Sequence, residues 1–127
     1  MSDKSIAEKL LVKPGYKVLL VNAPAGYLHS LGDLPGGATI LNKPGGLVDL
    51  IQVFVSSKKD LESQLKNLKQ LLNAKGLLWV TYPKGTSRIK ADINRDSIND
   101  YAKSIGLQGV AMISVDDTWS ALRLKFI

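Results

Sequence analysis

Three nearly continuous apolar runs constrain this chain more than any other feature of its sequence. Residues 16–24 read YKVLLVNAP, residues 47–57 read LVDLIQVFVSS, and residues 76–83 read GLLWVTYP. Apolar residues at consecutive positions, without alternation, are typical of strands that are buried on both faces. Such strands occur in parallel sheets covered by helices, so the runs predict an α/β fold.

Helical patterns separate these runs. In residues 57–76 leucines recur at helical spacing, Ser57 and Asp60 have the spacing of a capping box, and Gly76 is placed to end the helix. Shorter helices are predicted at residues 5–12, 25–32 and 94–105, the last with Asn94 as its N-cap.

The last connection sets the direction of the final strand. Further strands are predicted at residues 36–43, 107–115 and 118–126, and only Asp116 and Asp117 connect the last two. This connection is too short for a crossover, so the final strand must be antiparallel to the one before it. We predict one domain, residues 1–127, with a Rossmann-like three-layer α/β sandwich, a mostly parallel sheet and the strand order 2-1-3-4-6-5.

The composition excludes some kinds of site. There is no cysteine and one histidine, so neither disulfides nor a zinc site is expected. The net charge of +6 favours a polyanionic partner, but lysine supplies most of it and is weaker than arginine in bidentate recognition. Most lysines are expected to solvate helix faces. Without a long apolar run, the chain is expected to be cytoplasmic.

The ligand edge of the predicted sheet is the carboxyl edge, where loops leave the parallel strands. Segments containing Asn22, Lys43 and Tyr82 should lie near this edge. The loop TYPKGTSR adds the cations Lys84 and Arg88 and the hydroxyls of Thr86 and Ser87. Charge-assisted donors of this kind suit a phosphate or carboxylate. The alternative is a surface loop whose hydroxyls bond to their own backbone.

The paired acids of the last turn have two interpretations. Asp116 and Asp117 are common turn residues, but one of them could accept a proton or bind a ligand. Their mutual repulsion favours a nearby cation, and Lys84 or Arg88 is expected to supply it. His29 is either a proton shuttle or an ordinary surface or core histidine.

The chain has two resemblances, one over most of its length and one over its C-terminal half. LLVKPGYKVLLVN and LKQLLNAKGLLWVTYP resemble the first strand and a later helix and strand of class I methyltransferases with a Rossmann fold. That family holds S-adenosylmethionine with a glycine-rich turn after the first strand and an acid after the second. Here the turn NAPAGY has only Gly26, and Asn42 and Lys43 stand where the acid belongs, so S-adenosylmethionine is not expected to bind.

The second resemblance is to an uncharacterised bacterial family, a domain of unknown function. LLWVTYPK, DINRD and DDTWSALRLK are similar to its members and imply no established activity. We therefore expect a protein that binds a small anionic or polar ligand at the carboxyl edge. The rival hypotheses are a transferase with a nucleotide-type cofactor and a basic protein associated with nucleic acid, and no pattern decides whether the chain is an enzyme.

Overall fold

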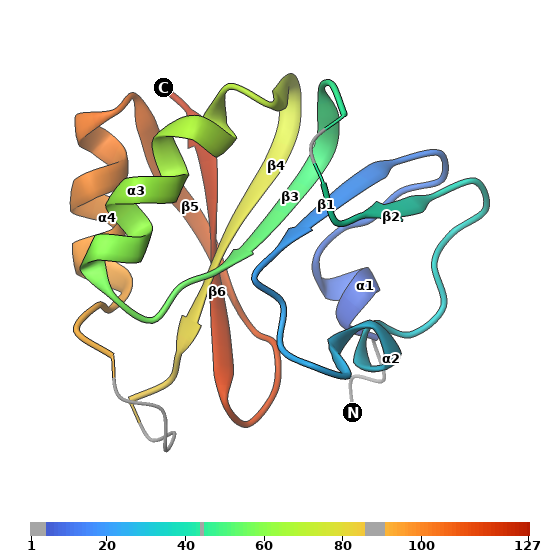
Figure 1. The fold of residues 1–127 in the computed structure, drawn as a ribbon, viewed down its shortest axis with the longest axis horizontal. Helices are drawn as coiled ribbons and strands as arrows, with labels where there is room; N and C mark the ends of the chain where they lie inside the picture. Colours follow the sequence, from blue (N-terminus) through green and yellow to red (C-terminus); the bar gives the residue numbers. More distant parts are fainter. Residues whose placement is uncertain (1–4, 44, 86–90) are drawn as a thin grey trace.

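The computed structural model describes residues 5–43, 45–85 and 91–127. Helices α3 and α4 cover one face of a six-stranded sheet, and the short helices α1 and α2 lie on the other (Figure 1). The elements in chain order are α1 (Ile6–Lys9), β1 (Lys17–Val21), α2 (Tyr27–Leu31), β2 (Thr39–Leu41), β3 (Val48–Phe54), α3 (Lys58–Lys69), β4 (Leu72–Pro83), α4 (Arg95–Ser104), β5 (Leu107–Ser114) and β6 (Trp119–Phe126). None of the described helices is both long and apolar enough to cross a membrane.

The strand order is β2-β1-β3-β4-β6-β5, as the sequence predicts. Strands β2, β1, β3 and β4 pair in parallel, and β6 is antiparallel to both β4 and β5. The fold class, the strand order and the direction of the final strand are therefore confirmed. Strands β1, β2 and β3 are shorter than predicted because their outer residues lie in the connecting loops.

The apolar runs are continuous because each strand contributes to two cores. On the α3 and α4 side, Leu19 and Ile51 pack with helix residues such as Leu65. On the α1 and α2 side, Leu20 and Leu50 pack with the residues of the short helices. Successive strand residues point to opposite faces, so a sheet covered on both sides buries consecutive residues.

Helix α3 begins where the sequence predicts and ends earlier. The Ser57 side chain accepts a hydrogen bond from the Asp60 backbone N–H, but the helix ends at Lys69. The predicted extension to Gly76 is wrong. Leu72 instead begins β4, and a Cβ on Gly76 would lie 2.6 Å from Leu72 Cδ1. Gly76 therefore allows a close approach within an irregular strand.

The ends of α2 and both boundaries of α4 agree with the prediction to within two residues, whereas α1 ends at Lys9 rather than at Val12. The Asn94 side chain accepts a hydrogen bond from the Ser97 backbone N–H, and α4 ends before Gly106, whose φ is +85°. Gly32 ends α2 with a φ of +84°. Only glycine adopts such angles at little cost, which is why it stops helices.

Candidate functional site

Two hollows open at the carboxyl edge, where the strand order reverses. Strand β1 lies between β2 and β3, so the loops leaving β1 and β3 diverge there, as they do at ligand sites of open α/β sheets. The larger hollow, of about 550 Å³, is lined by residues 22–29 together with Leu20, Ile40 and Asn42. The smaller, of about 370 Å³, is lined by Asn22, Phe54, Val55, Ser56, Asp60, Gln64 and Trp119. We call the two hollows together the Asn22 cleft, because Asn22 lines both.

Asn22 has the backbone conformation of a tight turn. Its φ is +60°, in the left-handed region that asparagine tolerates better than most residues. The side-chain Nδ2 donates a hydrogen bond of 3.0 Å to Oε1 of Gln64 on α3. The boundary between the two hollows is thereby fixed to a helix as well as to β1.

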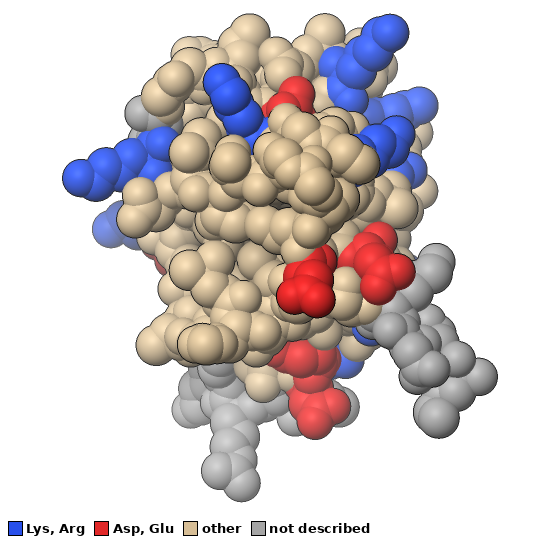
Figure 2. Space-filling model, turned by 90° about the vertical axis from the view of Figure 1, so that its right-hand side faces the viewer, with Lys and Arg blue, Asp and Glu red and all other residues tan. Residues whose placement is uncertain are grey.

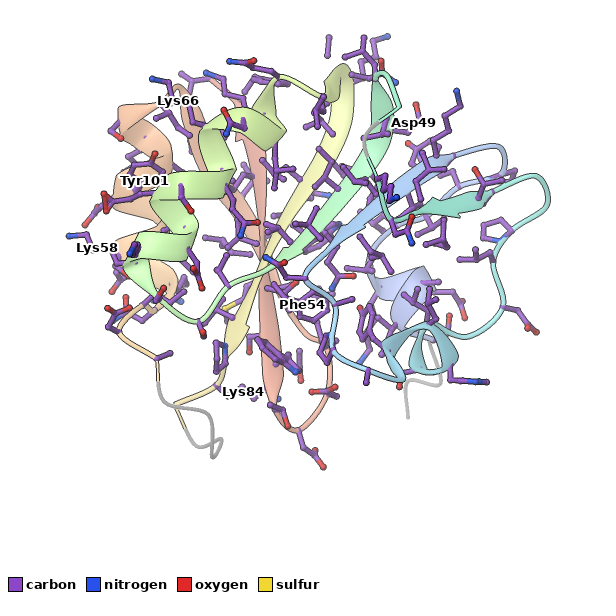
Figure 3. The ribbon with its side chains drawn as sticks, in the orientation of Figure 1. Asp49, Phe54, Lys58, Lys66, Lys84 and Tyr101 are labelled. Atoms are coloured by element: carbon purple, nitrogen blue, oxygen red, sulfur yellow. The ribbon has the colours of Figure 1, made fainter. Side chains whose placement is uncertain are left out.

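A chain of aromatic rings connects the two hollows. Tyr27 of the larger hollow contacts Phe54 edge to face, with ring centroids 4.7 Å apart. Phe54 in turn contacts Trp119 at 5.1 Å, and both of these rings line the smaller hollow. Phe54 lies at the carboxyl end of β3 (Figure 3). Edge-to-face pairs stabilise beyond the area they bury, so these contacts help to hold this side of the cleft in place.

A buried polar network anchors Tyr27. Its hydroxyl donates a hydrogen bond of 2.8 Å to Oε1 of Gln52, and Nε2 of Gln52 donates one of 3.0 Å to Oγ1 of Thr81. Gln52 and Thr81 are fully buried. Burial raises the pKa of Tyr27 well above its ordinary value, an effect that the hydrogen bond with Gln52 opposes and the nearby Asp116 carboxylate reinforces. Tyr27 is therefore a neutral, fixed wall of the cleft.

The beginning of the basic loop lies beside the last turn, as predicted. The Lys84 backbone N–H donates a hydrogen bond of 2.8 Å to the Thr118 carbonyl. Of the two cations predicted to pair with the acids, Lys84 does not do so, because its Nζ donates to Ser114 Oγ at 2.6 Å. The other, Arg88, lies outside the described residues. In the described part of the chain the one ion pair is between Arg95 and Asp96.

Asp116 has a structural function in its turn. Its Oδ1 accepts hydrogen bonds of 2.8 Å from the backbone N–H groups of both Thr118 and Trp119. Asp117 is exposed. The turn thus satisfies the Asp116 carboxylate with backbone donors, so this acid does not depend on an ion pair with Lys84.

The other predicted site residues are distributed over several places. Tyr82 is buried on the α3 and α4 side, where its hydroxyl donates to Met112 Sδ at 3.1 Å, and burial raises its pKa. Lys43 is exposed and is absent from the residues lining the cleft. Thr86, Ser87 and Arg88 lie outside the described residues.

The sequence interpretation missed Tyr27, Gln52, Phe54 and Gln64. One signal was available: Gln52 is an uncharged polar residue in the middle of an apolar strand, and a buried amide needs partners. The other residues look like ordinary core or helix positions.

The described cleft contains few chemically reactive groups. His29 and Asp60 are its titratable side chains besides Tyr27, and no lysine or arginine is among its described lining residues. Nor do the described residues contain a group of three or more acidic or histidine side chains that could hold a metal ion. The geometry suits binding by shape and hydrogen bonds.

A family of proteins of unknown function, DUF3052, matches residues 32–126. The chain belongs to this family. No curated protein matches the chain in sequence. The DUF3052 match includes both long helices and every strand except β1. The family therefore shares most of the sheet described above.

Solved structures with a similar fold include methyltransferases and a pre-rRNA processing protein. A SAM-dependent methyltransferase from Aquifex aeolicus superimposes with a TM-score of 0.65 and 16% identity, covering 95% of this chain and 89% of that one. The fibrillarin pre-rRNA processing protein of Methanococcus jannaschii superimposes with a TM-score of 0.62 and 16% identity, covering 91% of this chain and 68% of that one. A TehB-like SAM-dependent methyltransferase from Corynebacterium glutamicum superimposes with a TM-score of 0.61 and 15% identity, covering 99% of this chain and 90% of that one. These similarities establish a methyltransferase-like Rossmann fold for the DUF3052 chain.

Proposed function

We propose that this DUF3052 protein binds a small polar organic molecule in the Asn22 cleft. The observation that carries the proposal is the position of two adjoining hollows above the carboxyl ends of β1 and β3, where the strand order reverses. Their walls are held in place by the aromatic chain and by the buried network of Gln52. A preformed site of this kind costs little ordering on binding.

The lining indicates the kind of ligand. Carbon-rich side chains such as Leu20, Leu28 and Ile40 line the larger hollow, which suits a ring or another apolar group. Asn22, Asn42 and Gln64 offer amide groups for hydrogen bonds at its border and in the smaller hollow. Of the cations named from the sequence, the two that the structure describes, Lys43 and Lys84, do not line either hollow. A polar, hydrogen-bonded ligand therefore fits better than a strongly anionic one.

The alternative function is a transferase, because two of the similar structures are SAM-dependent methyltransferases. Two features of this chain argue against S-adenosylmethionine. Residues 22–27 have only one glycine for close backbone approach to a cofactor. Asn42, which follows β2 and lines the cleft, is neutral. In the methyltransferases that the chain resembles, an acid at this position holds the ribose hydroxyls of the cofactor. We infer that the cleft accepts a different ligand.

Trp119 provides a direct assay for binding. It is half-buried and lines the smaller hollow, whereas the other tryptophan, Trp79, is buried and donates its Nε1–H to the Leu10 carbonyl. A panel of nucleosides, sugars, amino acids and aromatic acids is screened by thermal shift and by tryptophan emission. Binding in the cleft should change the emission of the parent and not that of a Trp119→Phe variant.

A matched pair of variants locates the site. Ala25→Phe places a large ring in the larger hollow, while Ala74→Phe makes the same change at an exposed position near the amino end of β4. We expect Ala25→Phe to lower the affinity for a ligand from the panel at least 10-fold and Ala74→Phe to preserve it. The proposal fails if both variants bind equally well, or if no compound of the panel binds.

A further inference from the structure

Lysines gather at the edge of the sheet opposite the Asn22 cleft. The parallel strands begin at this amino edge, and helices α3 and α4 end there. On the face that Figure 2 draws, with the amino edge uppermost, lysine and arginine side chains lie mostly in the upper half and carboxylates mostly in the lower half. We call the following residues the lysine edge: Lys17, Lys66, Lys75, Lys103 and Lys125.

The fold places these five lysines close together. Lys17 begins β1, Lys75 lies near the start of β4, and Lys125 lies near the end of the antiparallel β6. Neighbouring strands are about 4.8 Å apart, so three strand spacings separate β1 from β6 by about 15 Å. Lys66 and Lys103 lie in the last turns of α3 and α4, and Lys66 points from the upper end of α3 (Figure 3).

The positive charge of the lysine edge is not neutralised by neighbouring acids. All five lysines are exposed, and none has a carboxylate within 4.0 Å among the described residues. Asp49 is the acid at these strand ends, and its oxygens accept hydrogen bonds from the Lys17 backbone N–H and from Asn73 Nδ2, both of 2.8 Å. Its charge still weakens the local field, but the five lysines outnumber it at this edge.

Helix ends explain only part of this distribution. A lysine in the last turn offsets the negative end of the helix dipole, and Lys69 does so directly by donating to the Ile105 carbonyl at the end of α4. For this reason Lys69 is not counted in the lysine edge. Lys17, Lys75 and Lys125 are on strands, whose dipoles are small, and have no such function.

We propose that the lysine edge binds the phosphate backbone of nucleic acid without reading its sequence. Lysine is depleted in protein–protein interfaces, whereas interfaces with nucleic acid are strongly positive. Its ammonium is a point charge that contacts phosphates but is poorly suited to the bidentate recognition of bases. This proposal is independent of the ligand proposed for the Asn22 cleft, which lies at the other edge of the sheet.

The proposal predicts a steep dependence on salt. If five lysines neutralise five phosphates of a duplex, the logarithm of the affinity falls with a slope of about −4.5 against the logarithm of salt concentration. Raising the salt from about 50 to 200 mM then weakens binding about 500-fold. The measurement is fluorescence anisotropy of a labelled DNA duplex of mixed sequence, of about 20 base pairs.

Two triple variants with the same net charge separate a local surface from a general attraction. The first changes Lys17, Lys75 and Lys125 of the lysine edge to glutamine, and the second changes the exposed Lys43, Lys58 and Lys59 to glutamine. We expect the first to reduce the salt slope by about 2.7 and the affinity at least 10-fold. The second should change the affinity much less.

Three outcomes would overturn the proposal. The first is the absence of duplex binding by the parent protein at low salt. The second is an equal loss of affinity in both triple variants, which would indicate attraction by net charge alone. The third is displacement of the duplex by polyglutamate at an equal concentration of charges, which would indicate an acidic protein as the partner. Circular dichroism of both variants checks that they are folded.

Discussion

Replacing Gln52 by leucine tests whether the buried network stabilises the wall of the cleft. Gln52 is fully buried and hydrogen-bonds with both the Tyr27 hydroxyl and the Thr81 hydroxyl. Leucine has nearly the same size but leaves these two hydroxyl groups without their partner. A buried polar group without a partner costs about 1–3 kcal/mol. The free energy of unfolding of Gln52→Leu should therefore fall by about 2–4 kcal/mol, since leucine recovers part of the loss by its own apolar burial.

A second variant separates lost hydrogen bonds from altered packing. Combining Tyr27→Phe, Gln52→Leu and Thr81→Val removes all three polar groups while nearly preserving the shape of each side chain. Removing both partners of a buried hydrogen bond is far less costly than removing one. The triple variant should therefore be more stable than Gln52→Leu alone, although it carries two additional substitutions.

The assay is urea unfolding followed by far-ultraviolet circular dichroism, which does not depend on the tryptophans near the cleft. Equal m values would show that the variants unfold from similarly compact states. The reasoning is refuted if Gln52→Leu is within about 0.5 kcal/mol of the parent, a change that is ordinary even for surface substitutions. It is also refuted if the triple variant is less stable than Gln52→Leu.

Four further predictions concern the core, the pH dependence, a close contact and the cofactor. Leu65→Ala, at a buried position of α3, should lower the unfolding free energy by about 2–5 kcal/mol in the same urea assay. Burial raises the pKa of Tyr27 in the folded protein above the value of about 10 that it has when unfolded. Its contribution to the free energy of unfolding is therefore complete below about pH 10 and declines as the pH rises further. Urea titrations at pH 9–11 would show this decline. Gly76→Ala should cost about 1–3 kcal/mol, because the added Cβ would lie 2.6 Å from Leu72 Cδ1, and an unchanged urea midpoint would contradict this. Calorimetry with S-adenosylmethionine should show no micromolar site, and a stoichiometric one would restore the transferase hypothesis.

The fold was predictable because its determinants are local or topological. Continuous apolar runs of strand length, separated by helical patterns, indicate a parallel sheet. The short turn at Asp116 and Asp117 permits only an antiparallel final strand. Helix starts at Ser57 and Asn94 were equally clear, because capping depends on residues three positions apart.

The end of α3 was not predictable from the same kind of pattern. Residues 68–72 read LKQLL, which continues the leucine stripe, yet Leu71 already donates its backbone N–H to the Leu68 carbonyl in a turn, and Leu72 begins β4. The reason is tertiary, since Leu72 pairs with Val48 of β3. An apolar residue satisfies either a helix stripe or a buried strand, and only the neighbouring strand decides between them.

The candidate site was predictable in location but not in composition. The carboxyl edge follows from the parallel topology, and Asn22 lies there because it follows β1. The aromatic chain joins Tyr27, Phe54 and Trp119, which come from three distant segments of the sequence. Ring contacts of this kind depend on side-chain directions in the folded sheet, and no spacing in the sequence encodes them.

The interpretation of the positive charge changes most once the fold is known. In a parallel α/β sheet the helices begin at the carboxyl edge and end at the amino edge, so the dipole favours acids at one edge and lysines at the other. Asp60 and Asp96 in first turns, and Lys66 and Lys103 in last turns, follow this rule. A basic composition therefore does not make the carboxyl edge basic. Part of the charge in excess of helix capping lies at the amino edge, where Lys17, Lys75 and Lys125 on the strands supply it. The described lining of the ligand cleft contains no lysine or arginine, so its binding has to be explained by its shape and its amide groups.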